Sequence, residues 1–261
     1  MIGGLKFRPS SAAPPFGALA LPPAAPVAPA GPVDLSAEME TLLRSLGQSS
    51  AERGRVVQFA SAGTGEGTST IAREFALCAA RRSRKPVWLI DLDVFGLTQQ
   101  KAVAKDGRRF GALGKPASAT PDGSVFFAVN PAGEGEAEGR QSRFLSARPA
   151  AEGKLWVTRF HPERLEPGQA VTISRWPAYW NALRAHAEFI VIDAPAADRS
   201  TAAMTLAPIA DLNVMVVAAE AGDARGPAAL KQAIEQAGGK LAGLVFNRAQ
   251  ASAPAFLNSL F

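Results

Sequence analysis

The chain has 261 residues, of which 47% are hydrophobic and 20% are charged. This length and composition suit one large globular domain and exclude a chain that is disordered throughout. A net charge of +5 is too small to indicate nucleic acid as a partner. The single cysteine, Cys78, excludes an intrachain disulfide, and no apolar run reaches the roughly 18 residues that a membrane helix needs. We therefore expect a cytoplasmic protein without direct membrane insertion.

The N-terminal segment differs from the rest of the chain. Residues 1–33 are rich in alanine and proline and carry no acidic side chain, which predicts a disordered linker without a core of its own. Apolar side chains then recur at helical spacing over residues 39–46, and Gly47 suits the end of that helix. The folded domain is therefore expected to span residues 34–261.

Short apolar runs alternate with helical patterns in this domain. Strands are predicted over residues 56–60, 86–90, 124–129, 155–158, 189–193, 212–218 and 241–247. Helices are predicted over residues 71–82, 175–187 and 228–237, and a surface loop over 133–139. Continuous apolar strands that alternate with helices indicate a doubly wound, mainly parallel α/β sheet with helices on both faces. The pattern is weakest over residues 95–155.

A glycine-rich segment, residues 61–70, joins the first predicted strand to the next helix. There, glycines let backbone N–H groups converge on an anion, and the helix N-terminus adds positive potential. The phosphate-loop pattern G-x-x-x-x-G-K-[ST] is met except that Ala62 replaces its first glycine and Thr68 its lysine. The predicted phosphate-binding residues are Gly63, Thr64, Gly65, Glu66, Gly67, Thr68, Ser69 and Thr70.

Three aspartates follow predicted strands. Asp91 and Asp93 come after the strand over 86–90, and Asp193 ends the strand over 189–193. The carboxyl ends of parallel strands gather at one edge of the sheet, where ligands bind. Carboxylates at that edge can hold magnesium beside a phosphate loop. Alternatively, these aspartates are turn or capping residues.

Together these motifs resemble the MinD/ParA branch of P-loop ATPases. Within that branch they are most similar to the cytoplasmic tyrosine kinase domains of bacterial capsule and exopolysaccharide synthesis. Those domains carry the loop S-x-x-P-G-E-G-K-S-T, which residues 61–70 match except at Thr64 and Thr68. Their D-x-D-x-R motif is matched by Asp91 and Asp93, with a phenylalanine where the arginine belongs.

Other segments extend the resemblance from about residue 38 to residue 248. The family's D-x-P motif is matched by Asp193 and Pro195, and its strand that ends in asparagine near the adenine is matched at Asn247. The helix before the first strand is similar to an E-x-x-R-x-x-R interface motif. Glu38 and Arg44 fit that motif, while a threonine stands at its middle arginine.

The resemblance implies ATP and Mg²⁺ as cofactors. Ser69, Asp91 and Asp193 would then hold the metal, Asp91, Asp93 and Asp193 would be the catalytic carboxylates, and Asn247 would contact the nucleotide.

Two departures from the family bear on activity. A phosphate-loop lysine supplies a point charge against the β- and γ-phosphates, whereas Thr68 offers only a hydroxyl. Nucleotide affinity should therefore fall, unless Arg73 or Arg248 compensates. The family also autophosphorylates a tyrosine-rich tail, whereas residues 249–261 contain no tyrosine. The single tyrosine, Tyr179, is expected to be a packing residue.

The resemblance thus points to a degenerate kinase-like regulator of exopolysaccharide or capsule biosynthesis, with weak or no ATP turnover. Its partner would be the cytoplasmic tail of a membrane polysaccharide co-polymerase or export protein, which would recruit it to the inner membrane. Homo-oligomers are left open. Two alternatives are retained: an active ATP-binding tyrosine kinase or ATPase of the same family, and a MinD/ParA-like positioning ATPase.

Overall fold

The computed structural model describes residues 34–47, 53–131, 138–221 and 223–248. The predicted linker over residues 1–33 and the segment 249–261 lie outside the described residues, as does most of the predicted loop over 133–139. No helix in the described part is both long enough and apolar enough to cross a membrane.

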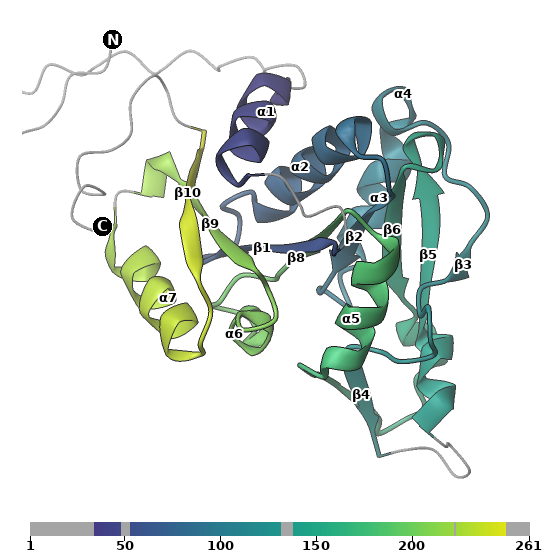
Figure 1. Ribbon diagram of the computed structural model, residues 1–261. Helices are drawn as coiled ribbons and strands as arrows, with labels where there is room; N and C mark the ends of the chain where they lie inside the picture. The colour runs from purple at the N-terminus through teal and green to yellow at the C-terminus, as the bar shows by residue number, and fades with distance from the viewer. Residues whose placement is uncertain (1–33, 48–52, 132–137, 222, 249–261) are drawn as a thin grey trace, which may run out of the picture. The chain divides into compact units, whose positions relative to one another are not determined.

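An eight-stranded sheet forms the centre of the described chain (Figure 1). Its strands are β1 (Arg55–Ser61), β2 (Val87–Asp91), β3 (Ala117–Ser118), β5 (Leu145–Ala150), β6 (Leu155–Phe160), β8 (Phe189–Asp193), β9 (Leu212–Ala218) and β10 (Leu241–Asn247). They lie in the order β10-β9-β1-β8-β2-β6-β5-β3. All pairs from β10 to β6 are parallel, and β5 and β3 are antiparallel additions at one edge.

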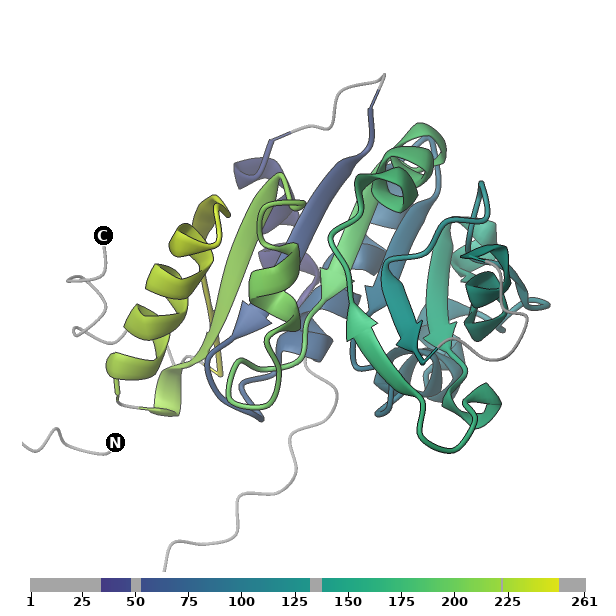
Figure 2. The same cartoon turned by 90° about the horizontal axis from the view of Figure 1, so that it is seen from below.

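Helices cover both faces of this sheet (Figures 1 and 2). One core includes side chains from α1 (Ser36–Ser45), α2 (Thr68–Arg82), α3 (Thr98–Lys105) and α4 (Gly107–Phe110). The other includes side chains from α5 (Pro177–His186), α6 (Ala202–Leu206) and α7 (Arg225–Gln236). The predicted doubly wound, mainly parallel α/β fold is therefore confirmed.

The central strands are apolar because both of their sides are covered. Every residue of β2 and β8 is buried, and so are all residues of β1 after the first. A parallel strand packed between two helical layers has no solvated side, so it favours an uninterrupted apolar run over alternation. Cys78 belongs to the same interior, since it lies on α2 with 8% of its surface exposed.

The weakly patterned region differs most from the predictions. The strand predicted over residues 124–129 is β4 (Phe127–Asn130), which pairs with β7 (Ala170–Ile173) in a separate two-stranded sheet. The strand predicted over 155–158 is β6, which lies inside the main sheet. β5, β7 and α3 were not predicted. An aromatic cluster joins β4 to α5, in which Phe126 lies 5.2 Å from Tyr179 and 5.6 Å from Trp180 between ring centroids.

Candidate functional site

The predicted phosphate loop is a strand-to-helix turn. β1 ends at Ser61 and α2 begins at Thr68. Gly65 and Gly67 have φ angles of 88° and 93°, a left-handed conformation that glycine adopts without a steric penalty. A Cβ atom on Gly67 would lie 2.0 Å from Nδ2 of Asn247, so the approach of the last strand also requires glycine here.

The loop presents donors without acceptors. Within the described residues, the five consecutive backbone N–H groups of residues 65–69 have no acceptor, and neither does the buried Thr68 hydroxyl. The loop lines a cavity of about 240 Å³, whose wall also includes Asp93, Asp193 and Arg199. In phosphate-binding proteins, unpaired N–H groups at the start of a helix are the donors that bind the phosphate group.

Two carboxylates brace the first half of the loop. Oε2 of Glu66 accepts the N–H groups of Ala62 at 3.1 Å and Gly63 at 3.3 Å. Asp198 accepts the N–H group and the hydroxyl of Thr64, both at 2.9 Å. Burial raises the pKa of Glu66, and the two N–H groups oppose that rise. A phosphate in the cavity would therefore lie close to two acidic side chains as well as to the amides.

Two of the predicted aspartates meet at the end of the sheet. Asp91 and Asp193 are partners in the register of β2 and β8, and only 4% and 2% of their surfaces are exposed. Burial raises the pKa of both carboxyls, and the charge of Asp193 raises that of Asp91 further. Asp93 lies nearer the surface and forms an ion pair with Arg199 at 2.9 Å. It lines the cavity but is separate from the buried pair.

A glutamine that the sequence analysis missed joins these groups. Nε2 of Gln99 donates to Oδ2 of Asp193 at 2.6 Å and to the backbone oxygen of Ser69 at 2.8 Å. Its backbone N–H donates to Oδ2 of Asp91 at 3.0 Å. Arg73 donates to Oε1 of Gln99 at 3.2 Å. Gln99 therefore links the start of α2 to both buried carboxylates.

The C-terminal strand reaches the loop through two side chains. Asn247 donates from Nδ2 to the backbone oxygen of Glu66 at 2.9 Å. Arg248 donates to the backbone oxygen of Gly65 at 3.1 Å. Both contacts hold the loop itself. Phe95, at the position of the family's arginine, is 62% exposed.

The structure brings most of the predicted site residues together. Residues 64–70, Asp93 and Asp193 line the cavity, Asp91 lies beside Asp193, and Asn247 touches the loop. Gly63 precedes them in the turn and donates to Glu66. The roles given to these residues in catalysis and in binding stay predictions.

Solved structures of other proteins superpose on this chain. The kinase domain of VpsO superposes with a TM-score of 0.50 and 19% identity over 83% of this chain and 93% of that domain. The kinase domain of the Escherichia coli tyrosine kinase ETK superposes with a TM-score of 0.50 and 13% identity, over 84% of this chain and 75% of that domain. The chimerical protein CapA2B2 superposes with a TM-score of 0.53 and 21% identity, over 75% of this chain and 76% of that protein. No protein-family model matches the chain, and no curated protein matches it either.

The chain has the P-loop fold of these kinase domains. The resemblance predicted from the loop and the aspartates is thus confirmed at the level of fold. In this P-loop fold β1 lies between β8 and β9, so the phosphate loop starts from the interior of the sheet.

The single tyrosine of this P-loop domain is fully buried. Tyr179 lies in the aromatic cluster with 0% of its surface exposed, and its hydroxyl has no hydrogen-bond partner within the described residues. Burial raises the pKa of the phenol. The predicted packing role is consistent with this position, because a kinase cannot reach the hydroxyl while the domain is folded.

We expect Tyr179→Phe to leave the free energy of unfolding unchanged or to raise it by up to about 1 kcal/mol, since it removes a buried hydroxyl without a partner. Urea denaturation followed by fluorescence measures this. Phe126→Ala is the comparison in the same cluster, and it should destabilise through lost packing. A clear loss of stability in Tyr179→Phe would show that the hydroxyl has a partner.

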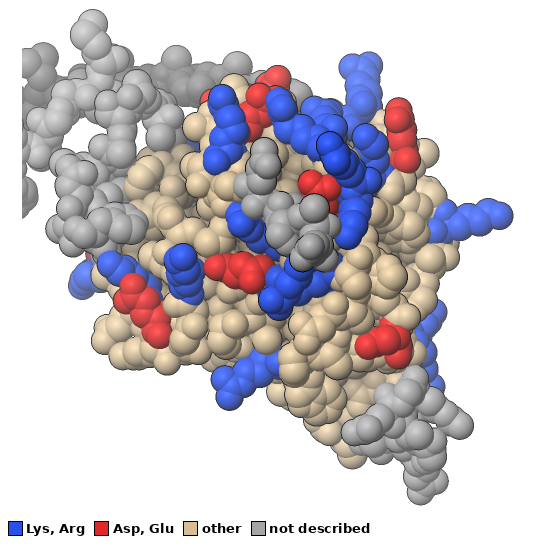
Figure 3. Space-filling model, viewed as in Figure 1, with Lys and Arg blue, Asp and Glu red and all other residues tan. Residues whose placement is uncertain are grey.

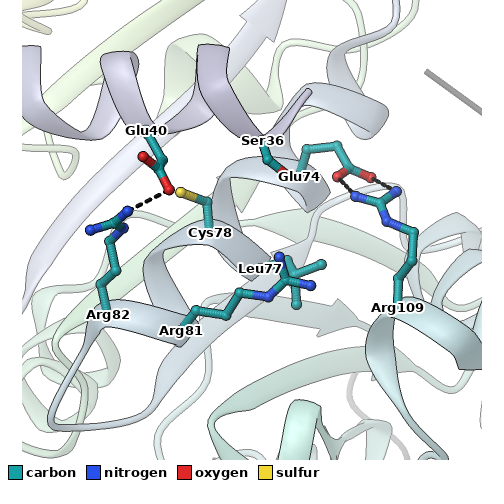
Figure 4. Close-up of a pocket in the computed structure, with 8 residues that line it drawn as sticks. All are labelled: Ser36, Glu40, Glu74, Leu77, Cys78, Arg81, Arg82 and Arg109. Carbon is teal, nitrogen blue, oxygen red and sulfur yellow. Dashed lines mark hydrogen bonds and ion pairs between the residues drawn. The ribbon is translucent and has the colours of Figure 1, made fainter. Parts of the chain in front are cut away.

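A second cavity, of about 330 Å³, lies against α1, α2 and α4 (Figure 4). It is lined by Ser36, Glu40, Glu74, Leu77, Cys78, Arg81, Arg82 and Arg109. Glu40 pairs with Arg82, and Glu74 pairs with Arg109. No residue of the predicted phosphate loop lines this cavity, so the loop cavity is the candidate site.

The predicted interface motif lies on the exposed part of α1. Glu38 and Arg44 are exposed, and Arg44 donates to the hydroxyl of Thr41 at 3.4 Å. Lys and Arg side chains gather on the upper part of the face in Figure 3, over the region where α1 and α2 lie. This surface is free to meet a partner, although its use stays a prediction.

Proposed function

We propose that this protein is a kinase-like regulator of exopolysaccharide or capsule biosynthesis that binds nucleotide weakly and turns over little or none. The observation that carries the proposal is Thr68. It occupies the position of the phosphate-loop lysine, at the start of α2, with its hydroxyl buried against the cavity. Without a cation there, phosphoryl transfer loses its main protein-derived charge.

The charges around the cavity support weak binding. Asp93 and Asp193 line it, and Glu66 and Asp198 brace its loop. Among the described residues of its wall the one cation is Arg199, which already pairs with Asp93. Free amides favour a phosphate, whereas these carboxylates oppose it. The balance leaves a site that can hold a phosphate group and is poorly suited to speed its transfer.

The proposed partner rests on the resemblance to the kinase domains of polysaccharide synthesis. We infer that the domain docks on the cytoplasmic tail of a membrane polysaccharide co-polymerase or export protein, which recruits it to the inner membrane. The exposed surface of α1 around Glu38 and Arg44 is the proposed contact. In this proposal the domain acts by binding its partner protein and not by catalysis.

The test compares polymer output in cells that lack the gene and in cells that carry variants. Deletion should abolish or shorten the polymer, whereas Ser69→Ala, at the predicted metal ligand, should restore it as well as the unaltered gene does. A folded Ser69→Ala protein that fails to restore the polymer would contradict the proposal. So would normal polymer in the deletion strain.

An active ATPase or tyrosine kinase acting on other proteins is the second candidate. The five open N–H groups of residues 65–69 favour it, because they are the part of the site that phosphate binding needs most. Release of labelled phosphate from ATP, abolished in Asp193→Asn, would support this candidate against the regulator.

A further inference from the structure

We propose that Gln99 takes the place of a divalent cation in this site, so that the loop accepts phosphate groups that carry no metal. The inference deepens the proposed function, since it concerns the same cavity. It goes beyond the resemblance, which implies Mg²⁺ at this position.

The hydrogen bonds of Gln99 leave none of its polar atoms unused. Its side-chain nitrogen binds both Asp193 and the backbone of Ser69, and its backbone nitrogen binds Asp91. Its side-chain oxygen accepts from Arg73. Gln99 is fully buried, so this arrangement is fixed by packing as well as by hydrogen bonds.

These contacts perform the electrostatic task of a cation. A metal in a phosphate-loop site would lie between the hydroxyl-bearing residue of the loop and the carboxylates that end the strands. Here N–H groups of Gln99 bridge the backbone oxygen of Ser69 and the carboxylates of Asp91 and Asp193, and the side-chain oxygen of Gln99 accepts from Arg73. The positive ends of these dipoles meet carboxylate oxygens that a metal would otherwise use.

Mg²⁺ therefore fits poorly at the carboxylate oxygens that Gln99 and the backbone already occupy. It needs oxygen ligands in near-octahedral geometry at about 2.0–2.1 Å. Both oxygens of Asp91 already accept backbone N–H groups, from Asp93 and Gln99, and Oδ2 of Asp193 accepts the Gln99 amide. A metal that used Oδ2 of Asp193 would have to displace the Gln99 side chain, which would cost the hydrogen bonds of Gln99 to Ser69 and Arg73.

The part of the site that faces the cavity is still open. Among the described residues, the Thr68 hydroxyl and Oδ1 of Asp193 are both buried without a partner, and both residues line the cavity. Together with the N–H groups of residues 65–69 they form a set that can receive a phosphate group: amides and a hydroxyl to donate, and one carboxylate oxygen to accept from a phosphate hydroxyl. Free phosphate and a nucleotide phosphate share this chemistry.

Metal binding to the purified full chain tests the central claim without any activity. Mn²⁺ alone is titrated and followed by electron paramagnetic resonance. The unaltered protein should bind no Mn²⁺ at this site, whereas Gln99→Ala should gain a site at least about tenfold tighter than any background binding. Gln100→Ala is the matched control, because Gln100 is the next residue, is also buried, and donates only to the backbone of Val157 at 2.9 Å.

A Gln99→Glu variant covers the case in which Gln99→Ala fails to fold. It keeps the side-chain shape and adds a third carboxylate beside Asp91 and Asp193, so Mn²⁺ should raise its melting temperature strongly. Mn²⁺ binding by the unaltered protein, or equal responses of the Gln99 and Gln100 variants, would overturn the inference. The regulator proposal would survive that result, because polymer output tests it separately.

Calorimetric titrations with inorganic phosphate and with ADP test the ligand. Both are run in EDTA and again in Mg²⁺. The unaltered protein should bind at least one of them in EDTA, and Mg²⁺ should not tighten that binding, whereas Mg²⁺ should tighten ADP binding to Gln99→Ala about tenfold. Binding of ADP alone would identify a nucleotide, and binding of both would identify the phosphate group as sufficient. Binding of neither in EDTA would refute the metal-free phosphate site.

Discussion

Replacing Thr68 by lysine is expected to tighten ATP binding about 30-fold or more. A cation about 4 Å from a phosphate gains on the order of 4 kcal/mol at an effective dielectric near 20. About half of this is lost to desolvation and to fixing the side chain, and the remaining ~2 kcal/mol corresponds to about 30-fold in affinity. The cavity offers a place for the ammonium group, since the Thr68 hydroxyl binds nothing and the free Oδ1 of Asp193 is part of the same wall.

Calorimetry of the unaltered protein and of Thr68→Lys, with a non-hydrolysable ATP analogue, measures this gain. Thr172→Lys is the matched control, because it makes the same change of charge at an exposed position of β7. Equal affinities of Thr68→Lys and the unaltered protein for the ATP analogue would mean that another cation already contacts the phosphates in place of the lysine. Arg73, which binds Gln99, and Arg248, which binds the loop at Gly65, would then be the residues to examine.

Asp193→Asn is expected to raise the free energy of unfolding more at pH 8 than at pH 4. Burial raises the pKa of this carboxyl from 3.8 to about 6, so the folded state holds the proton more tightly than the unfolded state does. Stability therefore falls as the pH rises from about 4 to about 6, and the loss is complete above that range. Asparagine carries no charge, so it does not share this loss of stability at high pH.

The amide also suits the surroundings of residue 193. Its oxygen can still accept from Gln99, and its NH₂ group can occupy the position of the unpartnered Oδ1. Asp91→Asn is the contrasting variant, because both oxygens of Asp91 accept backbone N–H groups and one of them would be replaced by a donor. Urea denaturation in EDTA between pH 4 and pH 8 measures both. A Asp193→Asn protein whose stability gain did not grow with pH would contradict the expectation.

The strands that the sequence predicts well are those with no solvated side. The runs that became β2 and β8 contain four apolar residues in succession before each aspartate, and both are wholly buried. β5 was missed because polar residues separate Leu145, Ala147 and Ala150 and because Pro149 interrupts the run. It lies between β6 and β3 in the antiparallel part of the sheet. β7 alternates exposed and half-buried residues over four positions, which is too short a signal.

The predictions about the site divide in the same way, into residues that the sequence indicates and residues that it does not. Glycines and aspartates at the ends of apolar strands predict a loop and an acidic edge of the sheet. The loop and the aspartates lie where they were expected. Gln99 and Asp198 were missed because a glutamine at the start of a polar helix and an aspartate in a turn have many ordinary uses. Their importance comes from tertiary placement, Gln99 between two strand ends and Asp198 against Thr64. A pattern along the chain cannot carry that information.

The open N–H groups of residues 65–69 also make the loop a reporter of its own occupancy. Amide hydrogens without an acceptor exchange with deuterated water quickly, whereas those of β1, in the interior of the sheet, should exchange slowly. A bound anion would slow the exchange of five consecutive amides at once. Mass spectrometry of a single peptide could thus detect the natural ligand in a cell extract, even when that ligand is never chemically transformed.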